Sequence, residues 1–302
     1  MNVNITVFIP TKNEIIHIER SVRSALKLTP NVYVVDSAST DGTIEMAESL
    51  GVVVLQYDWT ASSNFSTKFN WALENLPTKT TWIIRLDADE YFLEDTINTL
   101  SDELAKIDPS INAATLNRRI HFHGRWIKHS GQNPRPMSRV TRSGFCRYEP
   151  RWLDEHVEVD GNKIANLSLD FVDDNLMTSS QWVKKHDGYA IKEAVEMLHQ
   201  EIEIFQREEM HGNIGKSAKL AKKEKSIYAQ MPLYWRAFLY FFYRHFIRLG
   251  FLDGYQGFLW NFFQGWWYRA LIDVKISEIK KNCGNDSSKI RAYCKKEYGI
   301  EI

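Results

Sequence analysis

Three acidic residues, Asp87, Asp89 and Glu90, directly follow the apolar run 82–86. Such a run is typical of a buried strand, and buried strands carry carboxylates only where something compensates their charge. At the carboxyl end of a strand, Asp87 and Asp89 would face the crevice in which open α/β sheets bind ligands. Because side chains alternate along a strand, one aspartate could bind a divalent cation while the other acts through water. The alternative is a strand end followed by a helix with an acidic first turn at 94–95.

The segments around these acids alternate between strand and helix. Short apolar runs rich in β-branched residues alternate with segments in which apolar residues recur at helical spacing. This order is typical of βαβ units and predicts an α/β fold with a mostly parallel sheet covered on both faces. The expected strands are 3–10, 32–35, 52–57 and 82–86, and the expected helices begin near 13, 44 and 65.

Polar clusters stand at three of the predicted strand ends, in residues 10–14, 36–37 and 87–89. Successive βαβ units bring the carboxyl ends of their strands to one edge of the sheet. We therefore expect the three clusters to converge on one site, which a helix cap after a single strand does not explain.

Three segments resemble the signature segments of family 2 glycosyltransferases: VFIPTKNE at 7–14, VVDSASTDGT at 34–43 and LDADE at 86–90. The resembled enzymes are inverting, have the GT-A fold and use sugar nucleotides. The resemblance implies a GT-A catalytic domain, which we expect over residues 1–180. Residues 124–131 and 252–258 resemble segments of the subgroup that includes lipopolysaccharide-core β-glucosyltransferases and O-antigen transferases.

The resemblance also implies roles for single residues. Asp89 would bind Mg²⁺ or Mn²⁺, which neutralises charge on the departing nucleoside diphosphate, and Asp87 would contact ribose or a metal-bound water. Asp36 would accept a hydrogen bond from uracil, although Asp36 and Ser37 could instead form a turn. Lys68 lies in Lys-Phe-Asn, where the subgroup often has Gln-Arg/Lys-Asn, so a phosphate role for Lys68 stays open. The expected donor site comprises Pro10, Thr11, Asn13, Glu14, Asp36, Ser37, Lys68 and Asp87.

A catalytic base is expected in the segment 151–157, which holds the adjacent acids Asp154 and Glu155 and the imidazole of His156. Inverting transfer requires one carboxylate that deprotonates the acceptor hydroxyl as it attacks the anomeric carbon. In the resembled family an acidic pair about this far past the metal motif provides the base. We favour Glu155 over Asp154, while His156 could orient the base, reach the metal or simply be a hydrogen-bonded histidine.

The segment 120–151 is rich in histidine, arginine, glycine and proline and poor in regular pattern. A zinc site is not indicated, because no cysteine lies at ligand spacing from its irregularly spaced histidines. We expect either contacts to a donor or acceptor diphosphate or an ordinary solvated surface.

The pattern becomes helical beyond Ser179 and predicts a helical extension over residues 181–302. Between 213 and 252, eight lysines and arginines face one acid, and aromatic residues are dense at 233–243 and 258–268. Basic and aromatic residues on helices are typical of a segment lying in a membrane interface. The alternative is that these aromatics pack the helices onto the catalytic domain.

Composition excludes several other classes. The 302 residues carry 38 basic and 38 acidic side chains, so no overall field favours nucleic acid as a partner. Three scattered cysteines suit a reducing compartment, and neither a signal peptide nor a membrane-spanning run is recognisable. We expect a cytoplasmic protein peripheral to the inner face of the cytoplasmic membrane.

The expected reaction moves a hexose from a UDP-sugar to a lipid-linked or lipopolysaccharide/O-antigen glycan, with inversion to a β-linkage. Two alternatives stay open. One is a sugar nucleotidyltransferase, although the first strand lacks the glycine-rich phosphate loop such an enzyme would want. The other is a non-catalytic scaffold that binds nucleotide sugars, which would not need the acids at 154–155.

Overall fold

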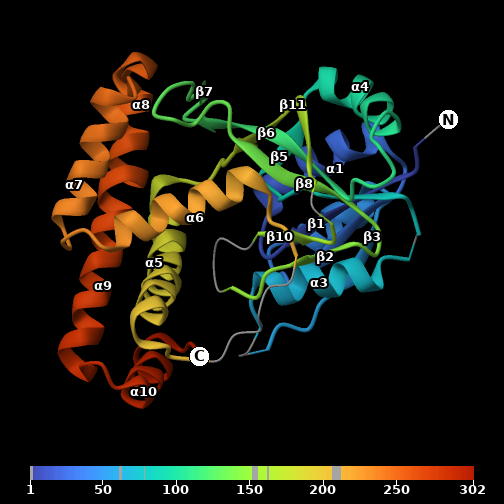
Figure 1. Cartoon of the computed structure of the whole chain (residues 1–302). Helices are drawn as coiled ribbons and strands as arrows, with labels where there is room; N and C mark the ends of the chain where they lie inside the picture. Colours follow the sequence, from blue (N-terminus) through green and yellow to red (C-terminus); the bar gives the residue numbers. More distant parts are fainter. Residues whose placement is uncertain (1–2, 61–62, 78, 152–155, 162, 206–211) are drawn as a thin grey trace.

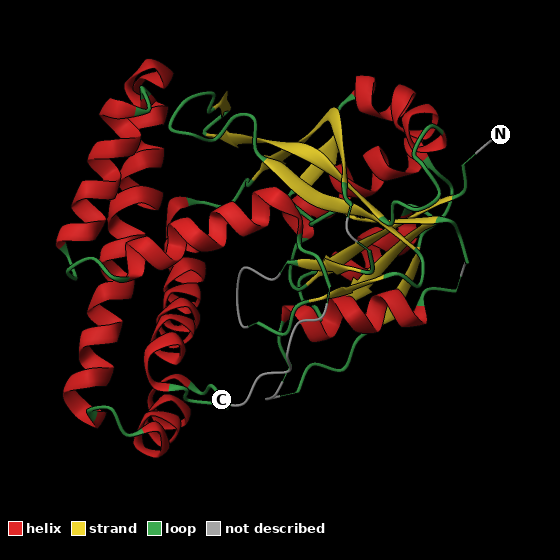
Figure 2. Ribbon diagram, viewed as in Figure 1, coloured by secondary structure: helices red, strands yellow, loops and turns green. Residues whose placement is uncertain are grey.

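The computed structural model describes residues 3–60, 63–77, 79–151, 156–161, 163–205 and 212–302. An α/β half and an all-helical half lie side by side, and one helix, α6 (Gly215–Ala229), extends between them (Figures 1 and 2).

A nine-stranded mixed sheet forms the centre of the first half. Its order is β3-β2-β1-β4-β8-β6-β11-β5, with β7 paired to β6. The strands β3, β2, β1 and β4 are parallel, β8 is antiparallel to β4 and β6, and β11 is parallel to β6. The predicted α/β fold is therefore confirmed, with its parallel part at the N-terminal end of the sheet. The strands are β1 (Ile5–Thr11), β2 (Val32–Asp36), β3 (Val53–Gln56), β4 (Trp82–Arg85), β5 (Glu90–Phe92), β6 (Ala113–Phe122), β7 (Arg125–Trp126), β8 (Pro136–Arg142) and β11 (Ala165–Asp174).

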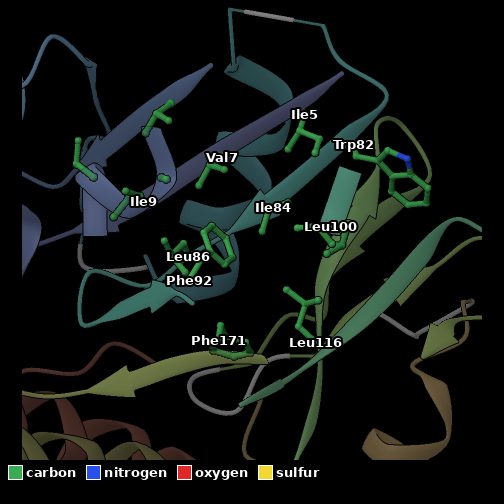
Figure 3. Close-up of a cluster of buried hydrophobic side chains, with 14 of the residues drawn as sticks. Ile5, Val7, Ile9, Trp82, Ile84, Leu86, Phe92, Leu100, Leu116 and Phe171 are labelled. Carbon is green, nitrogen blue, oxygen red and sulfur yellow. The ribbon is translucent and has the colours of Figure 1, made fainter. Parts of the chain in front are cut away.

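Helices cover both faces of this sheet, and alternation along β1 explains why. Ile5, Val7 and Ile9 point to one face, where they pack with residues of α1 and α4 in the buried cluster of Figure 3. Phe8 points to the other face and packs with Phe69 of α3. A central strand buried on both faces reads as a continuous apolar run, as β1 does. The helices are α1 (Ile15–Leu28), α2 (Thr43–Ser49), α3 (Phe65–Asn75) and α4 (Glu94–Ala105).

The second half is built on the long helix α5 (Ser179–Ile202), which starts at a capping box between Thr178 and Gln181. Its inner face packs against α9 and α10 in a separate apolar cluster. Among the described residues, no helix is both long and apolar enough to cross a bilayer. The remaining elements are α7 (Trp235–Phe242), η1 (Tyr243–Ile247), η2 (Gly250–Asp253), α8 (Gly254–Trp260), η3 (Asn261–Trp267), α9 (Tyr268–Cys283) and α10 (Ser287–Tyr298).

Candidate active site

The three predicted polar clusters lie at one edge of the sheet. Thr11, the last residue of β1, is opposite Asp36, the last residue of β2, and β4 ends beside β1 with Arg85 opposite Phe8. A cleft of about 3040 Å³ opens at this edge, and the helical half forms its other wall. The predicted site residues that line it are Pro10, Thr11, Asn13, Glu14, Ser37, Lys68, Asp87 and Asp89. Asp154 and Glu155 lie outside the described residues.

Asp36 is fully buried behind the cleft rather than in its lining. Its carboxylate accepts hydrogen bonds from the Thr11 hydroxyl at 2.7 Å and from the Ser39 amide and hydroxyl at 2.7 and 2.5 Å. These bonds join the loop after β2 to the end of β1. Asp36 thus shapes the site from below, and its contact with a base stays a prediction.

The loop after β1 is held by Asn13, whose φ of 56° lies in the left-handed region that asparagine tolerates. The backbone amide of Asn13 donates a hydrogen bond to the Ser39 hydroxyl at 2.7 Å, and its side-chain oxygen accepts one from the Thr40 backbone amide at 2.8 Å. The loops after β1 and β2 are therefore one hydrogen-bonded unit, as binding of one ligand by both would require.

Glu14 connects this unit to the helical half. One carboxylate oxygen lies 3.2 Å from Nζ of Lys185 on α5, and the other lies 2.6 Å from Nδ1 of His17. Nε2 of His17 accepts a hydrogen bond from the Leu176 amide at 2.9 Å, so Nδ1 carries the hydrogen and donates a hydrogen bond to Glu14. Burial would lower the pKa of Lys185, but Tyr189, Asp89 and Glu14 outweigh burial and raise it.

Lys68 on α3 is a buried cation in the cleft lining beside the end of β1, with only 3% of its surface exposed. Its Nζ donates to the Thr11 carbonyl at 2.7 Å. Burial lowers the pKa of Lys68 to about 7, although Asp36 opposes the shift. A phosphate would supply the negative charge that this ammonium group lacks in the free protein.

Asp87 is paired with two arginines. Its carboxylate oxygens lie 3.3 Å from Nε of Arg85 and 2.8 Å from Nη2 of Arg139. Burial would raise the pKa of Asp87, but Arg139 and Arg85 outweigh it and lower the pKa to about 2. Asp87 is therefore a permanent carboxylate that is held in place by guanidinium groups.

Two further acids beside Asp87 behave differently. Burial raises the pKa of Glu90 to about 8 and that of Asp173 to about 6, although Arg139 and Arg118 oppose the respective shifts. Both lie close enough to Asp87 and Asp89 for the negative charges to add to the effect. Glu90 and Asp173 are therefore protonated more easily than Asp87, which stays ionised.

Asp89 is the member of this cluster that suits direct metal binding. It is half-buried, lines the cleft and accepts one side-chain hydrogen bond, from the Asn175 amide to Oδ2 at 2.9 Å. The described residues contain no group of three or more His, Cys, Asp or Glu arranged around a common metal position. One carboxylate oxygen fits Mg²⁺ or Mn²⁺, which keep several waters and take further ligands from substrate phosphates.

The predicted base segment is fixed at both of its ends. β9 (Cys146–Tyr148) and β10 (Val157–Val159) pair antiparallel. Glu149 directly follows β9, and it contacts Arg151 on one side of the segment and His156, which directly precedes β10, on the other. Nδ1 of His156 lies 3.3 Å and Nη1 of Arg151 lies 3.9 Å from its carboxylate, and Lys222 of α6 binds it at 2.8 Å. Burial would raise the pKa of Glu149, but hydrogen bonds from His156 and Lys222 lower it to about 2. Arg151 and His156 line the cleft.

Some site residues were not predicted from the sequence. Asn175 directly follows β11, so the rule that ligands meet strand ends could have found it once β11 was recognised. Lys185 and Tyr189 come from α5, one turn apart, and burial raises the pKa of Tyr189 to about 12. No local pattern marks them, because their place depends on how the helical half packs.

The segments 124–131 and 252–258, which the sequence singled out together, lie against each other. Asp253, 2% exposed, accepts from the His129 amide at 2.8 Å and lies 2.9 Å from Nδ1 of that histidine. Asn261 donates to the Ser130 hydroxyl at 2.8 Å, and the Ser130 amide donates to the Arg248 carbonyl at 2.9 Å. These segments therefore join the two halves of the molecule.

Comparison with known proteins agrees with this geometry. The family model described as glycosyl transferase family 2 matches residues 6–170 of the 302. An uncharacterized glycosyltransferase of Rickettsia bellii is 26% identical over 287 residues, which cover 92% of this chain and 88% of that protein.

Solved structures of other proteins match this chain only at low sequence identity and low TM-score. A crystal structure of S. aureus TarS 1-349 is 15% identical with a TM-score of 0.45, covering 97% of this chain and 92% of that one. In a longer TarS structure, at 18% identity and a TM-score of 0.40, the match covers 65% of this chain but only 40% of that one. Glucosyl-3-phosphoglycerate synthase from Mycobacterium tuberculosis, crystallised with Mn²⁺, UDP-glucose and phosphoglyceric acid, is 20% identical with a TM-score of 0.32, over 39% of this chain and 44% of that one.

The family assignment rests on the family model, which spans the sheet from β1 to β11 and all three polar strand ends. The chain belongs to glycosyltransferase family 2 and is an enzyme with the GT-A fold.

Proposed function

We propose that this glycosyltransferase moves a hexose from a UDP-sugar to a hydroxyl of a lipid-linked or lipopolysaccharide/O-antigen glycan, with inversion to a β-linkage. The observation that carries the proposal is the convergence of Thr11, Lys68 and Asp89 on one cleft at the end of β1 and β4. The loops after β1 and β2 would hold the nucleoside, and Lys68 would contact the diphosphate. Asp89 would hold Mg²⁺ or Mn²⁺, which supplies charge neutralisation for the leaving nucleoside diphosphate.

The base would be Glu155, or its neighbour Asp154. The flanking residues Arg151 and His156 both line the cleft, which supports a base in the segment between them. This carboxylate would take the proton of the acceptor hydroxyl as the hydroxyl oxygen attacks the anomeric carbon from the side opposite the diphosphate. Glu149 would keep the two flanks in place.

The enzyme would work at the inner face of the cytoplasmic membrane. Large apolar side chains are exposed along the outer helices, which lie at the edge of the molecule away from the sheet (Figure 1). We call them the aromatic surface: Trp235, Phe238, Phe242, Phe246, Phe251, Tyr255 and Phe258. An exposed patch of this kind marks an interaction surface, and aromatic rings suit the lipid headgroup region. The enzyme would bind a lipid-linked acceptor where this surface contacts the membrane.

A panel of UDP- and dTDP-sugars, incubated with the enzyme and Mn²⁺, tests the donor. We expect slow release of free UDP from one or a few UDP-sugars, because water can replace the acceptor. Release of pyrophosphate from a sugar phosphate and UTP would instead identify a nucleotidyltransferase. Tight binding of UDP-sugars without any turnover, even with membrane extracts as acceptor, would identify a scaffold.

A further inference from the structure

Arg244 in η1 is a buried cation that has no charged partner among the described residues. It is 4% exposed, and it lines the cleft. Within the part of the chain that the structure describes, its Nε and Nη2 atoms have no hydrogen-bond partner, and no carboxylate forms an ion pair with it. The guanidinium instead lies 5.5 Å from the ring centre of Tyr240 and forms a hydrogen bond with the hydroxyl of that tyrosine. Leaving a buried charge unpaired is costly, and an anion bound in the cleft would pair with it.

The unpaired atoms lie on one edge of the guanidinium group. Nε and Nη2 point their hydrogens in the same direction, which matches two oxygens of a carboxylate or a phosphate. The same helical segment contains an internal comparison eight residues earlier. Arg236, 2% exposed, directs its Nε and Nη2 at Asp273 at 2.8 and 2.5 Å. Arg244 presents the same edge, and no acid of the described segments lies opposite it.

The surroundings of Arg244 are positive. The guanidinium of Arg269 lies 5.7 Å from the Tyr240 ring centre, and its Nε is also buried without a hydrogen-bond partner. Burial would raise the pKa of Tyr240, but the positive charges of Arg244, Arg269 and Arg135 lower it below its ordinary value. The negative charge of Glu224 opposes the arginines. Glu193 on α5 lies beside Arg269 at 3.6 Å, but this acid is also paired with Lys225 at 2.5 Å.

This group of arginines is separate from the donor end of the cleft. Lys185, beside Glu14, and Glu193, beside Arg269, lie two turns apart on α5 and both line the cleft. Eight residues of helix span about 12 Å. Phe242 and Phe246, two residues to either side of Arg244, belong to the aromatic surface. Arg244 therefore lies between the donor end and the surface that we propose faces lipid.

We propose that Arg244, supported by Arg269, binds an anionic group of the acceptor through its free Nε–Nη2 edge. The acceptor is then a phosphorylated or acidic glycolipid rather than a neutral glycan. This inference rests on the proposed function, since it assigns the acceptor of the same cleft. The anion could be a phosphate of the lipid carrier or the carboxylate of an acidic sugar, and the experiment separates these sources.

Isothermal titration calorimetry tests the proposal with the donor end first saturated by UDP and Mg²⁺. The probes are hexyl phosphate, hexanoate and hexanol, which share an alkyl chain and differ in the head group. We expect the wild type to bind at least one anion more tightly than hexanol, and Arg244→Gln to weaken that anion about tenfold or more. Arg244→Lys keeps the charge without the two-donor edge and should also lose most of the affinity. The matched control Lys219→Gln removes an exposed charge from the same cleft and should change affinity less than about twofold.

The outcomes separate the explanations. Tighter binding of hexyl phosphate assigns the site to a phosphate, and tighter binding of hexanoate assigns it to a carboxylate. Equal binding of all three probes by the wild type, or equal losses in Arg244→Gln and Lys219→Gln, would overturn the proposal. So would weaker binding of UDP itself to Arg244→Gln, because the arginine would then serve the donor. A wild type that binds the anion but no UDP would refute the proposed donor while the anion site stands.

Discussion

Lys68 is the residue whose replacement separates binding from stability most sharply. Its side chain is 3% exposed, and burial lowers its pKa from 10.5 to about 7. A fall of that size corresponds to about 5 kcal/mol of cost for keeping the ammonium charged in the folded protein. The unfolded chain keeps the ordinary pKa and so binds more protons between about pH 7 and pH 10. The penalty is therefore full below pH 7 and lessens as the pH rises.

The Lys68→Met variant should consequently be more stable than the wild type at about pH 6, with Tm higher by about 5 °C or more. The stabilisation is reduced by the loss of the hydrogen bond to the Thr11 carbonyl, at about 1 kcal/mol. The gain should shrink towards pH 9, where the wild-type lysine is neutral in the folded protein. Thermal unfolding followed by circular dichroism measures both values.

UDP binding should change in the opposite direction. A bound diphosphate favours the ammonium form, so the wild type must take up a proton on binding, and its affinity for UDP should fall about tenfold per pH unit between about pH 7 and pH 9. The ligand's own phosphates are fully ionised over this range, since they titrate near pH 6. Lys68→Met should bind UDP about 10- to 100-fold more weakly at pH 7, without this pH dependence.

Calorimetry in two buffers of different ionisation enthalpy counts the proton directly. Lys12→Met is the control, because Lys12 is an exposed cation that lines the same part of the cleft. Equal affinity of the wild type for UDP at pH 7 and pH 9 would show that Lys68 does not take up a proton when UDP binds. If the affinity of Lys68→Met for UDP fell with pH as steeply as that of the wild type, another group would be taking up the proton.

Three further changes test the proposed chemistry. Asp89→Ala should abolish transfer and the metal dependence of UDP binding, since one carboxylate would carry the ion; full activity in EDTA would contradict this. Glu155→Gln should lower turnover by about 10²-fold or more with little change in UDP affinity, and the same loss in Asp154→Asn instead would reverse the assignment. Replacing Phe242 and Phe246 together by serine should reduce cosedimentation with anionic liposomes while UDP binding persists, and unchanged cosedimentation would refute the membrane proposal.

The donor end of the site could be predicted because local pattern determines it. The apolar runs that become β1, β2 and β4 each end in polar residues, and parallel pairing places those ends together. Asp36 nevertheless lies beneath the cleft, since its carboxylate is used by Thr11 and Ser39. Sequence order predicts which residues meet at an edge, but not which of them faces the ligand.

The opposite wall of the cleft could not be predicted in this way. Glu14 meets Lys185 of α5 across 171 positions. Such contacts depend on how α5 packs against the sheet, which helical periodicity alone does not define. For the segment 120–151, contact with a diphosphate stays a prediction. Arg139 binds Asp87 and Glu90, whereas Arg125 and Lys128 are exposed.

The helical half separates two signals that the sequence presents together. Four lysines of α6, Lys216, Lys219, Lys222 and Lys225, line the cleft, where Lys222 binds Glu149 and Lys225 binds Glu193. The aromatic surface lies on the outer helices. Positive charge and aromatic residues would therefore serve different partners. Attraction to a membrane would come mainly from burial of aromatic rings, whereas the buried Arg244 would bind the anionic acceptor in the cleft. Because salt screens charge but not apolar burial, added salt should weaken binding of an anionic acceptor more than it weakens attachment to lipid.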